Sequence, residues 1–117
     1  MSYVQGFLIP VPKAKKEAYI KVAKASGAIF QEYGAVRVVE NWSETTPEGK
    51  VTDFKKAVKA EEDEAVAFSW IEWPDQATCD AATEKMERDP RWEKMGDMPF
   101  DGKRLIYAGF ETIFSTE

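Results

Sequence analysis

Four segments of the chain combine β-favouring residues with apolar side chains on both of the faces that a strand presents. They are residues 3–10, 35–42, 65–73 and a last segment from about 104 to 114. A strand that is apolar at all of its alternating positions must be covered on both sides of its sheet. The fold therefore has to bury two faces of one sheet, which helices on a single side cannot do.

Two segments between these strands repeat apolar residues at the three- and four-residue spacing of a helix. The first follows Pro12, which suits a first helical turn, and ends at Gly34, which suits a C-terminal cap. Gly27 inside this helix costs about 1 kcal/mol relative to Ala and suggests a close approach to another backbone. The second helix is predicted to begin after an N-cap at Asp75 and to end before Pro90.

A shorter helix is predicted within residues 51–64. It follows the polar loop SETTPEGK, and Thr52 or Asp53 would cap it. Phe54 and Val58 also fit the alternation of a strand, so a strand is an open alternative for this segment.

The last third of the chain contains a second short helix and a turn. Asp89 and Pro90 precede the segment RWEKM, whose Trp92 and Met95 are expected to anchor it as a lid over one end of the sheet. The segment PFDG, residues 99–102, has the composition of a turn.

The resulting order is strand, helix, strand, short insertion, strand, helix, strand. It predicts an α+β fold of the ferredoxin-like βαββαβ type, with a four-stranded antiparallel sheet and two main helices on one face. Because the strands are apolar on both faces, the second face needs another cover. We expect a homodimer in which two sheets close into an α/β barrel.

Composition narrows the range of functions. The 117 residues are expected to form one domain, residues 1–117. The chain has no histidine and one cysteine, so triad hydrolases, zinc sites and disulfides are disfavoured, and no cofactor or metal is expected. A net charge of −5 disfavours nucleic acid as a partner. Neither a membrane span nor a secretory signal is recognisable, and a cytoplasmic location is expected.

Five segments carry a resemblance that extends over almost the whole chain. They are SYVQGFLIPVPK, AVRVVENW, PEGKVTDFKKAVKAEEDE, FSWIEWP and MPFDGKRLIYAGFE. The sequence resembles the YbaA-like family of small uncharacterised bacterial proteins. This resemblance implies membership of the dimeric α/β-barrel superfamily, which includes cofactor-independent monooxygenases, isomerases and haem-degrading enzymes. It implies no catalytic residues, since several of those enzymes use a histidine that this chain lacks.

Glu40 and Glu72 are the first candidates for catalysis. If their strand faces coincide, two carboxylates meet beside Trp42 and Trp70, where the pKa of a carboxyl is raised and acid–base chemistry becomes available. The alternative is that each carboxylate pairs with a cation such as Arg37, Arg104 or a lysine.

Tyr107 is a third catalytic candidate, because its hydroxyl could donate to a bound carbonyl. Gly109 and Gly6 lie on strands predicted to be adjacent, where two missing side chains would leave a hollow. That hollow could receive a ligand, or equally a neighbouring aromatic ring. The Tyr107 ring could also simply fill the core.

Several other side chains are candidates for binding a ligand. Arg37 and Asn41 share one face of the second strand and could bind a carboxylate or carbonyl, or a partner's acidic side chain at a dimer interface. Lys103 and Arg104 could attract an anion, or could form a solvated strand start. The single cysteine, Cys79, lies in an apolar helical stripe and is expected to be buried and inert.

Two functions are consistent with these observations. In the first, each subunit binds an aromatic or otherwise apolar small molecule between sheet and helices, and transforms it without a metal in a monooxygenase-like or isomerase-like reaction. In the second, the protein is a non-enzymatic homodimeric structural or interaction module whose aromatic residues only fill the core. The ligand candidates for the first function are Arg37, Asn41, Trp42, Trp70 and Arg104.

Overall fold

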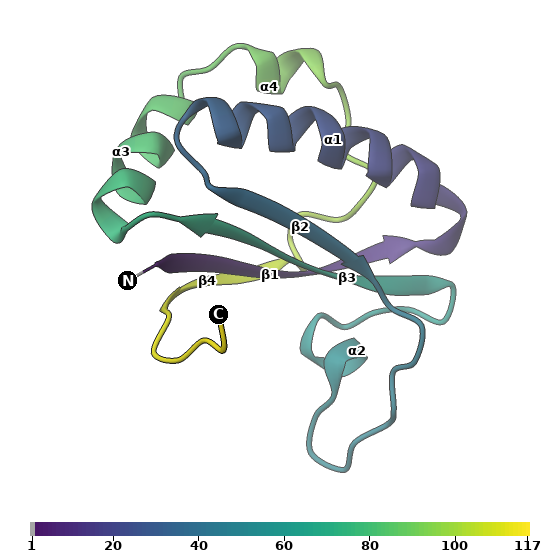
Figure 1. The fold of residues 1–117 in the computed structure, drawn as a ribbon. Coiled ribbons are helices and arrows are strands. Elements are labelled where there is room, and N and C mark those ends of the chain that lie inside the picture. The colour runs from purple at the N-terminus through teal and green to yellow at the C-terminus, as the bar shows by residue number, and fades with distance from the viewer. Residues whose placement is uncertain (1) are drawn as a thin grey trace.

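A four-stranded antiparallel sheet forms the centre of the computed structural model, which describes residues 2–117 (Figure 1). The strands are β1 (Tyr3–Pro12), β2 (Arg37–Trp42), β3 (Glu64–Trp73) and β4 (Ile106–Glu111), in the spatial order β2-β3-β1-β4. The helices are α1 (Lys16–Glu32), α2 (Phe54–Ala57), α3 (Gln76–Met86) and α4 (Arg91–Lys94). The class is therefore α+β, as the sequence predicts.

The register of the central strands determines which side each residue faces. β1 and β3 pair over ten residues, from Tyr3 opposite Trp73 to Pro12 opposite Glu64. Because successive side chains of a strand point to opposite faces, odd-numbered residues of both strands face one way and even-numbered residues the other. The alternation inferred from the sequence therefore continues without a shift along both strands.

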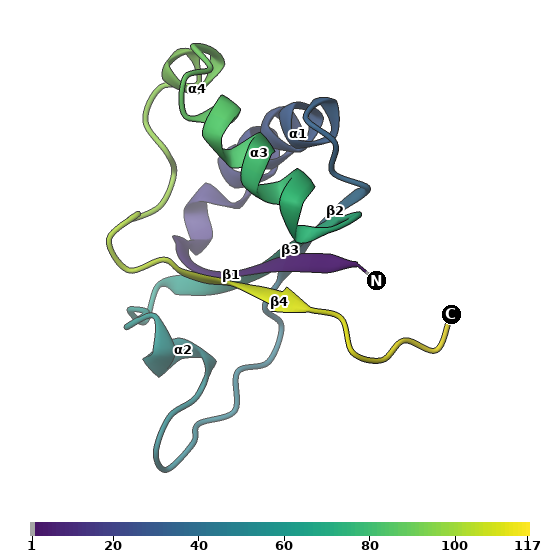
Figure 2. The same cartoon turned by 90° about the vertical axis from the view of Figure 1, so that its left-hand side faces the viewer.

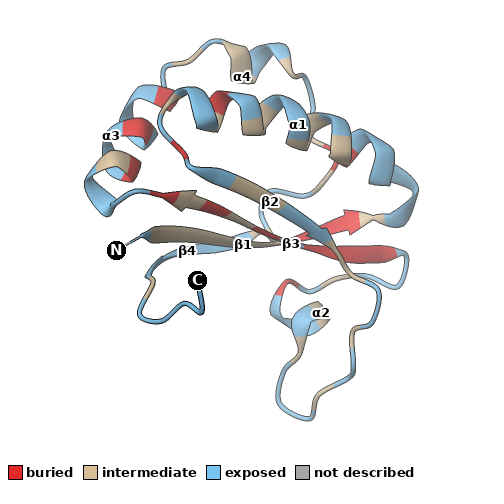
Figure 3. Cartoon of the chain, viewed as in Figure 1, coloured by how far each residue is buried: buried red, intermediate tan, exposed pale blue. Residues whose placement is uncertain are grey.

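Helices α1 and α3 cover the face to which the odd-numbered residues of β1 and β3 point (Figures 1 and 2). Two groups of buried residues fill this layer (Figure 3). One surrounds Trp73 and includes Ile71 and residues of α3, and the other surrounds Val11 and Tyr19. Trp73 is 0% exposed, and its indole N–H donates to Gln5 Oε1 at 3.0 Å. Its polar group is thus satisfied inside the core.

The helix ends follow the signals in the sequence. Asp75 caps α3 by accepting from the Thr78 N–H at 2.7 Å, and Asp53 caps α2 by accepting from the Lys56 N–H at 2.7 Å. Gly34 follows α1 with a φ of +112°, a backbone conformation that favours glycine. For residues 51–64, the prediction of a helix rather than a strand is confirmed, although the helix has only four residues.

The opposite face of the sheet carries no long helix within residues 2–117. The excursion between β2 and β3, which contains α2, and the segment after β4 both lie on this side (Figures 1 and 2). Arg104 ties the excursion to the sheet, because it donates to both carboxylate oxygens of Glu64, at 2.7 and 2.8 Å, and to the Lys59 carbonyl. Most of this face stays open.

Two element boundaries and one contact differ from the prediction. Pro12 ends β1 instead of opening the helix, and α1 begins at Lys16 after a single 3-10 turn, because Pro12 keeps an extended ψ of 131°. β4 covers only Ile106–Glu111 and not residues 104–114, because its pairing with β1 runs only from Leu8 opposite Ile106 to Tyr3 opposite Glu111. A Cβ added at Gly27 would lie 4.0 Å from the Val38 side chain, so the glycine faces a side chain and not another backbone as predicted.

Helix α4 lies beyond α1 rather than directly over the sheet (Figure 1). Trp92 and Met95 anchor it by packing against the core group around Trp73, so the expected anchoring is confirmed and the expected position over the sheet is wrong. The Trp92 indole donates to the Met86 carbonyl at 2.9 Å, which fixes α4 to the end of α3. Within residues 2–117, no helix has the length and apolarity needed to cross a bilayer.

Replacing Trp73 by alanine should lower the free energy of unfolding by about 3–5 kcal/mol, because the change leaves a large cavity in a fully buried position. Val51→Ala is the control, since Val51 is 94% exposed and should change stability by no more than about 0.5 kcal/mol. Urea unfolding followed by tryptophan fluorescence and far-UV circular dichroism measures both. Equal losses in the two variants would contradict the core described here.

Candidate functional site

An apolar pocket of about 210 Å³ lies between α1 and the covered face of the sheet. It occupies the space between the two groups of buried core residues, where neither group fills the layer completely. Its polar side chains are Tyr19, Ser26, Glu40 and Ser69. Its apolar walls are formed mainly by Phe7, Ile9, Phe30, Ile71, Trp92, Met98, Phe100 and Leu105.

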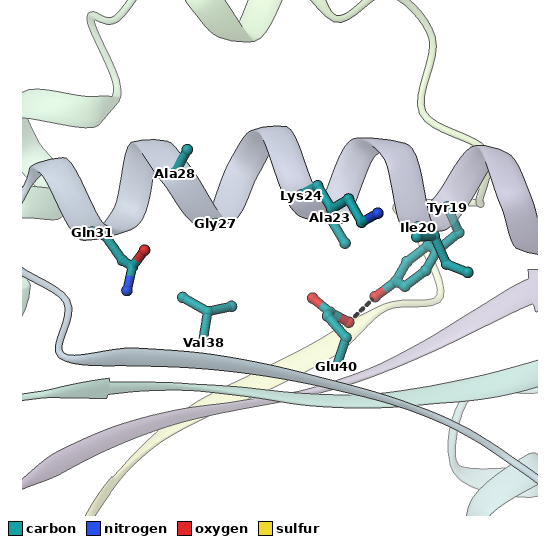
Figure 4. Close-up of a pocket in the computed structure, with 9 residues that line it drawn as sticks. All are labelled: Tyr19, Ile20, Ala23, Lys24, Gly27, Ala28, Gln31, Val38 and Glu40. Carbon is teal, nitrogen blue, oxygen red and sulfur yellow. Dashed lines mark hydrogen bonds between the residues drawn. The ribbon is translucent and has the colours of Figure 1, made fainter.

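A wider groove of about 500 Å³ runs between α1 and β2, an edge strand of the sheet (Figure 4). Tyr19, Ala23 and Glu40 line both this groove and the apolar pocket. Gly27 helps to keep the groove open, because it places no side chain between α1 and Val38. The groove and the pocket therefore adjoin at Glu40.

Tyr19 and Glu40 form a hydrogen-bonded pair at the point where the groove and the pocket meet. The Tyr19 hydroxyl donates to Glu40 Oε1 at 2.6 Å (Figure 4). Tyr19 is only 5% exposed, and its ring packs between Trp42 and Phe100, with ring centroids 6.0 and 6.1 Å away. This packing fixes the hydroxyl in place, so that the hydrogen bond joins α1 to the edge strand.

Glu40 combines an exposed backbone with a partly enclosed carboxylate. The residue as a whole counts as exposed because β2 is an edge strand, whereas its hydrogen-bonded carboxylate is partly buried under α1. Among residues 2–117, none of the ion pairs involves Glu40.

Both groups of the pair titrate away from their ordinary ranges. Desolvation raises the pKa of the Glu40 carboxyl, while hydrogen bonds from Tyr19 and Ser69 act in the opposite direction. Burial, followed by the negative charge of Glu40, raises the pKa of the Tyr19 hydroxyl well above its usual range. Tyr19 therefore remains a neutral donor, and Glu40 can accept a hydrogen bond or a proton from a molecule in the pocket.

The predicted meeting of Glu40 and Glu72 does not occur. Glu40 lies opposite Ser69 in the sheet, and Glu72, three residues further along β3, points to the other face. There it accepts from the Trp70 indole at 2.9 Å and lies 3.8 Å from Arg37. The alternative of a cation partner is thus confirmed for Glu72 and wrong for Glu40, which has Tyr19 instead.

The predicted hollow at Gly6 and Gly109 is also absent from the described sheet. Gly6 pairs with Ala108, so the two glycines point to opposite faces. The ring of Phe110 lies against Gly6, and the ring of Tyr3 lies against Gly109. The alternative that a neighbouring aromatic ring fills the space is confirmed at both positions.

Tyr107 does not enter the pocket or the core. It is exposed on β4 and stacks on Phe7, with ring centroids 5.8 Å apart. β4 is an edge strand, and in the described sheet no strand lies beyond it to cover Tyr107. The structure therefore does not join Tyr107 to Glu40.

The ligand candidates lie on two different faces. Trp42 faces the helices and packs on Tyr19, whereas Trp70 lies on the open face with Arg37 and Asn41. The Asn41 amide donates to the Phe68 carbonyl at 3.0 Å. Only Trp42 of this set lies beside the Tyr19–Glu40 pair.

Arg104 is also used within the fold. It binds Glu64 and Asp101, and its pKa is raised by hydrogen bonds to these two carboxylates. These two carboxylates and the Lys59 carbonyl occupy most of the Arg104 donors, while Lys103 stays exposed. Cys79 is buried as predicted, and burial raises the pKa of its thiol. Within residues 2–117, no three acidic or cysteine side chains gather as a metal site would require.

No motif in the sequence marks Tyr19, Phe100 and Trp92 as parts of a site. Tyr19 belongs to the apolar stripe of the first predicted helix, between Pro12 and Gly34. A tyrosine in such a stripe needs a hydrogen-bond partner for its hydroxyl. An acidic residue on a strand facing the helix is therefore the one indication that Tyr19 belongs to a site. Phe100 and Trp92 come from irregular or very short segments, for which periodicity gives no direction.

Glu40→Gln should stabilise the protein at neutral pH. Because the pKa of Glu40 is raised in the folded state, the free energy of unfolding falls as the pH rises from the ordinary carboxyl pKa to the pKa of folded Glu40. The neutral amide of glutamine does not ionise, so the variant avoids this loss of stability. The gain in melting temperature should shrink as the pH is lowered and Glu40 becomes protonated. Glu111→Gln, on exposed β4, is the control. A destabilised Glu40→Gln protein at pH 7 to 8 would contradict this account.

Comparison with known proteins places the chain in a family. Residues 2–102 match the family described as "Protein of unknown function (DUF1428)". The chain is 55% identical over 114 residues to "Uncharacterized protein YbaA" of Escherichia coli (strain K12), with 97% of each chain covered, and the protein of that name from Shigella flexneri matches equally. Among solved structures, "De novo designed protein Foldit4" aligns with a TM-score of 0.48 and 14% identity, covering 96% of this chain and 99% of that one.

The resemblance to YbaA-like proteins is thus confirmed by sequence identity over almost the whole length of the chain. No specific activity accompanies the family match, so function has to be argued from the site itself. Because the match covers residues 2–102, this chain belongs to the DUF1428 family of proteins of unknown function.

Proposed function

We propose that the protein binds a small apolar molecule in the pocket between α1 and the sheet. The observation that carries this proposal is the combination of an apolar pocket with a single hydrogen-bonded Tyr19–Glu40 pair at its entrance. Ligand sites are usually concave and mostly apolar, with a few polar groups that fix orientation. The pocket under α1 has this composition.

The size of the pocket supports a ligand of about one aromatic ring. At about 210 Å³ it is larger than a cavity of about 150 Å³ that is known to bind benzene in another protein. Aromatic walls from Phe7, Phe30 and Trp92 favour a flat apolar ligand. The groove past Glu40 supplies an entry path.

Proton transfer is the reaction for which the pair is best suited. A carboxylate with a raised pKa is a better base toward a weakly acidic ligand than an exposed one, and Tyr19 supplies a neutral donor next to it. This supports the isomerase-like form of the proposal. The monooxygenase-like form has no comparable support from the residues of the pocket.

Ala23→Leu should abolish ligand binding, because Ala23 lines both groove and pocket and three added carbons fill the space. Ala25→Leu is the matched control, since Ala25 lies on the exposed side of the same helix. Ligand-observed NMR with a panel of single-ring aromatic compounds measures binding in the parent and both variants. Compounds that bind the parent and Ala23→Leu equally would contradict the site. A folded parent that binds none would favour the non-enzymatic module.

We further propose that the protein is a homodimer of the dimeric α/β-barrel type, built on a ferredoxin-like subunit. The strand order β2-β3-β1-β4, with α1 and α3 on one face, supports the subunit fold. On the open face, Phe54, Phe68 and Phe110 are each about half exposed. A second copy of the same sheet would cover these rings with a surface of equal character.

The dimensions of the open face are adequate for such a contact. Four strands spaced about 4.8 Å apart, with about six residues each at 3.3 Å, give a flat footprint of about 400 Å². The α2 excursion and the segment after β4 project on the same side and add contact area (Figures 1 and 2). The sheet alone supplies about half of the roughly 800 Å² per partner of a standard stable interface, and these segments would have to supply the rest.

Phe68→Asp should convert the dimer into a monomer, because it places a charge at the centre of the apolar face, where Phe68 packs against Phe54 and Trp70. Ala25→Asp, on the helical side, should leave the dimer intact. Light scattering after size exclusion gives the mass of each variant, with circular dichroism as a check of folding. A monomeric parent protein would contradict this proposal.

A further inference from the structure

We propose that the ligand of this pocket is a small aromatic amine in its protonated form, whose ammonium group pairs with the Glu40 carboxylate while its ring lies between Phe7, Phe30 and Trp92. This inference rests on the proposed binding function and specifies the chemical class of the ligand. It is argued from the charges around the pocket, from the free acceptor capacity of Glu40, and from the shape of the apolar walls.

The charge of the site is unbalanced toward the negative. Among the residues that line pocket and groove, only Glu40 and Lys24 carry a charge. Lys24 is exposed, and within residues 2–117 it forms no ion pair with Glu40. A partly buried carboxylate without a cation is unfavourable, and a bound cation would compensate it.

Glu40 has room for an additional donor. A carboxylate offers about four acceptor positions. Tyr19 occupies one position on Oε1, and Ser69 supplies a further hydrogen bond. The carboxylate lies at the junction of groove and pocket, so a group entering from either space can reach it (Figure 4).

The three possible ligand charges are not equally suited to this arrangement. An anionic ligand would be repelled by Glu40 and would find no cation within the apolar pocket as described. A neutral hydroxyl could donate one hydrogen bond to the carboxylate but would not compensate its charge. An ammonium group donates up to three, forms charge-assisted bonds to a carboxylate, and is attracted to the aromatic faces of the walls.

The size of the pocket limits the apolar part of the amine. One aromatic ring with a two-carbon chain suits about 210 Å³ and places the nitrogen at the pocket entrance when the ring lies in the interior. Tyr19 stays hydrogen-bonded to Oε1 in this arrangement and keeps the carboxylate oriented. The amine is therefore recognised by one charge and one ring.

The test compares three compounds of equal size on the full-length protein by isothermal titration calorimetry. They are 2-phenylethylamine, 2-phenylethanol and phenylacetate. We expect the amine to bind at least about tenfold more tightly than the alcohol, because the amine adds a positive charge and further donors to the single hydrogen bond that a hydroxyl can donate to the carboxylate, and phenylacetate to bind most weakly. In Glu40→Gln the ratio of the dissociation constants of alcohol and amine should fall to about threefold or less, while the alcohol still binds.

The possible outcomes separate the two proposals. If alcohol and amine bind the parent equally, or if the preference for the amine survives in Glu40→Gln, the ligand class is wrong and the pocket stands. If none of the three compounds binds the folded parent, the ligand class and the proposed binding function both fail. Glu111→Gln, which removes a distant exposed charge, should retain the full preference, and a loss there would show that only net charge matters.

Discussion

The uninterrupted pairing of β1 with β3 is the constraint on which the rest of the molecule depends. Ten consecutive residue pairs place Trp73, Ile71 and Ser69 under the helices and Phe68 and Trp70 on the opposite side. A shift by one residue would exchange these two sets and expose Trp73. Pro10 and Val66, opposite each other in this ladder, are buried on the second side, so both faces of the pair restrict its register.

The pocket exists because the helical layer is filled from its two ends. One core group collects around Trp73 and α3, and the other around Val11 and the start of α1. Between them, Ser69 on the sheet and Ala23 on α1 are too small to close the gap. The hydrogen bond from Tyr19 to Glu40 spans this same region, so the weakest part of the packing is also the part that carries the polar pair.

Much of the fold was predictable because local signals and tertiary packing agree. Alternation located four strands, while Asp75 and Gly34 defined helix ends that the structure retains. The site was predictable only in part. The sequence identifies Glu40 as a candidate, but whether Glu40 meets Glu72 depends on how β2 aligns with β3, and alternation within one strand carries no such information.

Other features of the site arise from segments without periodicity. Phe100 reaches the pocket from a loop, and Trp92 from a helix of four residues. Their positions are determined by contacts with Tyr19 and Phe30, which lie far away in the sequence. Local sequence patterns predict the sheet and its helices. They do not predict the positions of two side chains that lie far apart in the sequence and depend on their contact with each other.

The packing of Tyr3 over Gly109 has a consequence for how such a sequence can diverge. An alanine methyl group at position 109 would lie only 2.6 Å from Tyr3 Cζ, so it requires the ring to move away. With a smaller residue at position 3, the close contacts of this methyl group with the tyrosine ring would be absent. Gly109→Ala is therefore tolerated when position 3 has already become smaller and is opposed when Tyr3 is still present. The two positions should change together among descendants of a common ancestor.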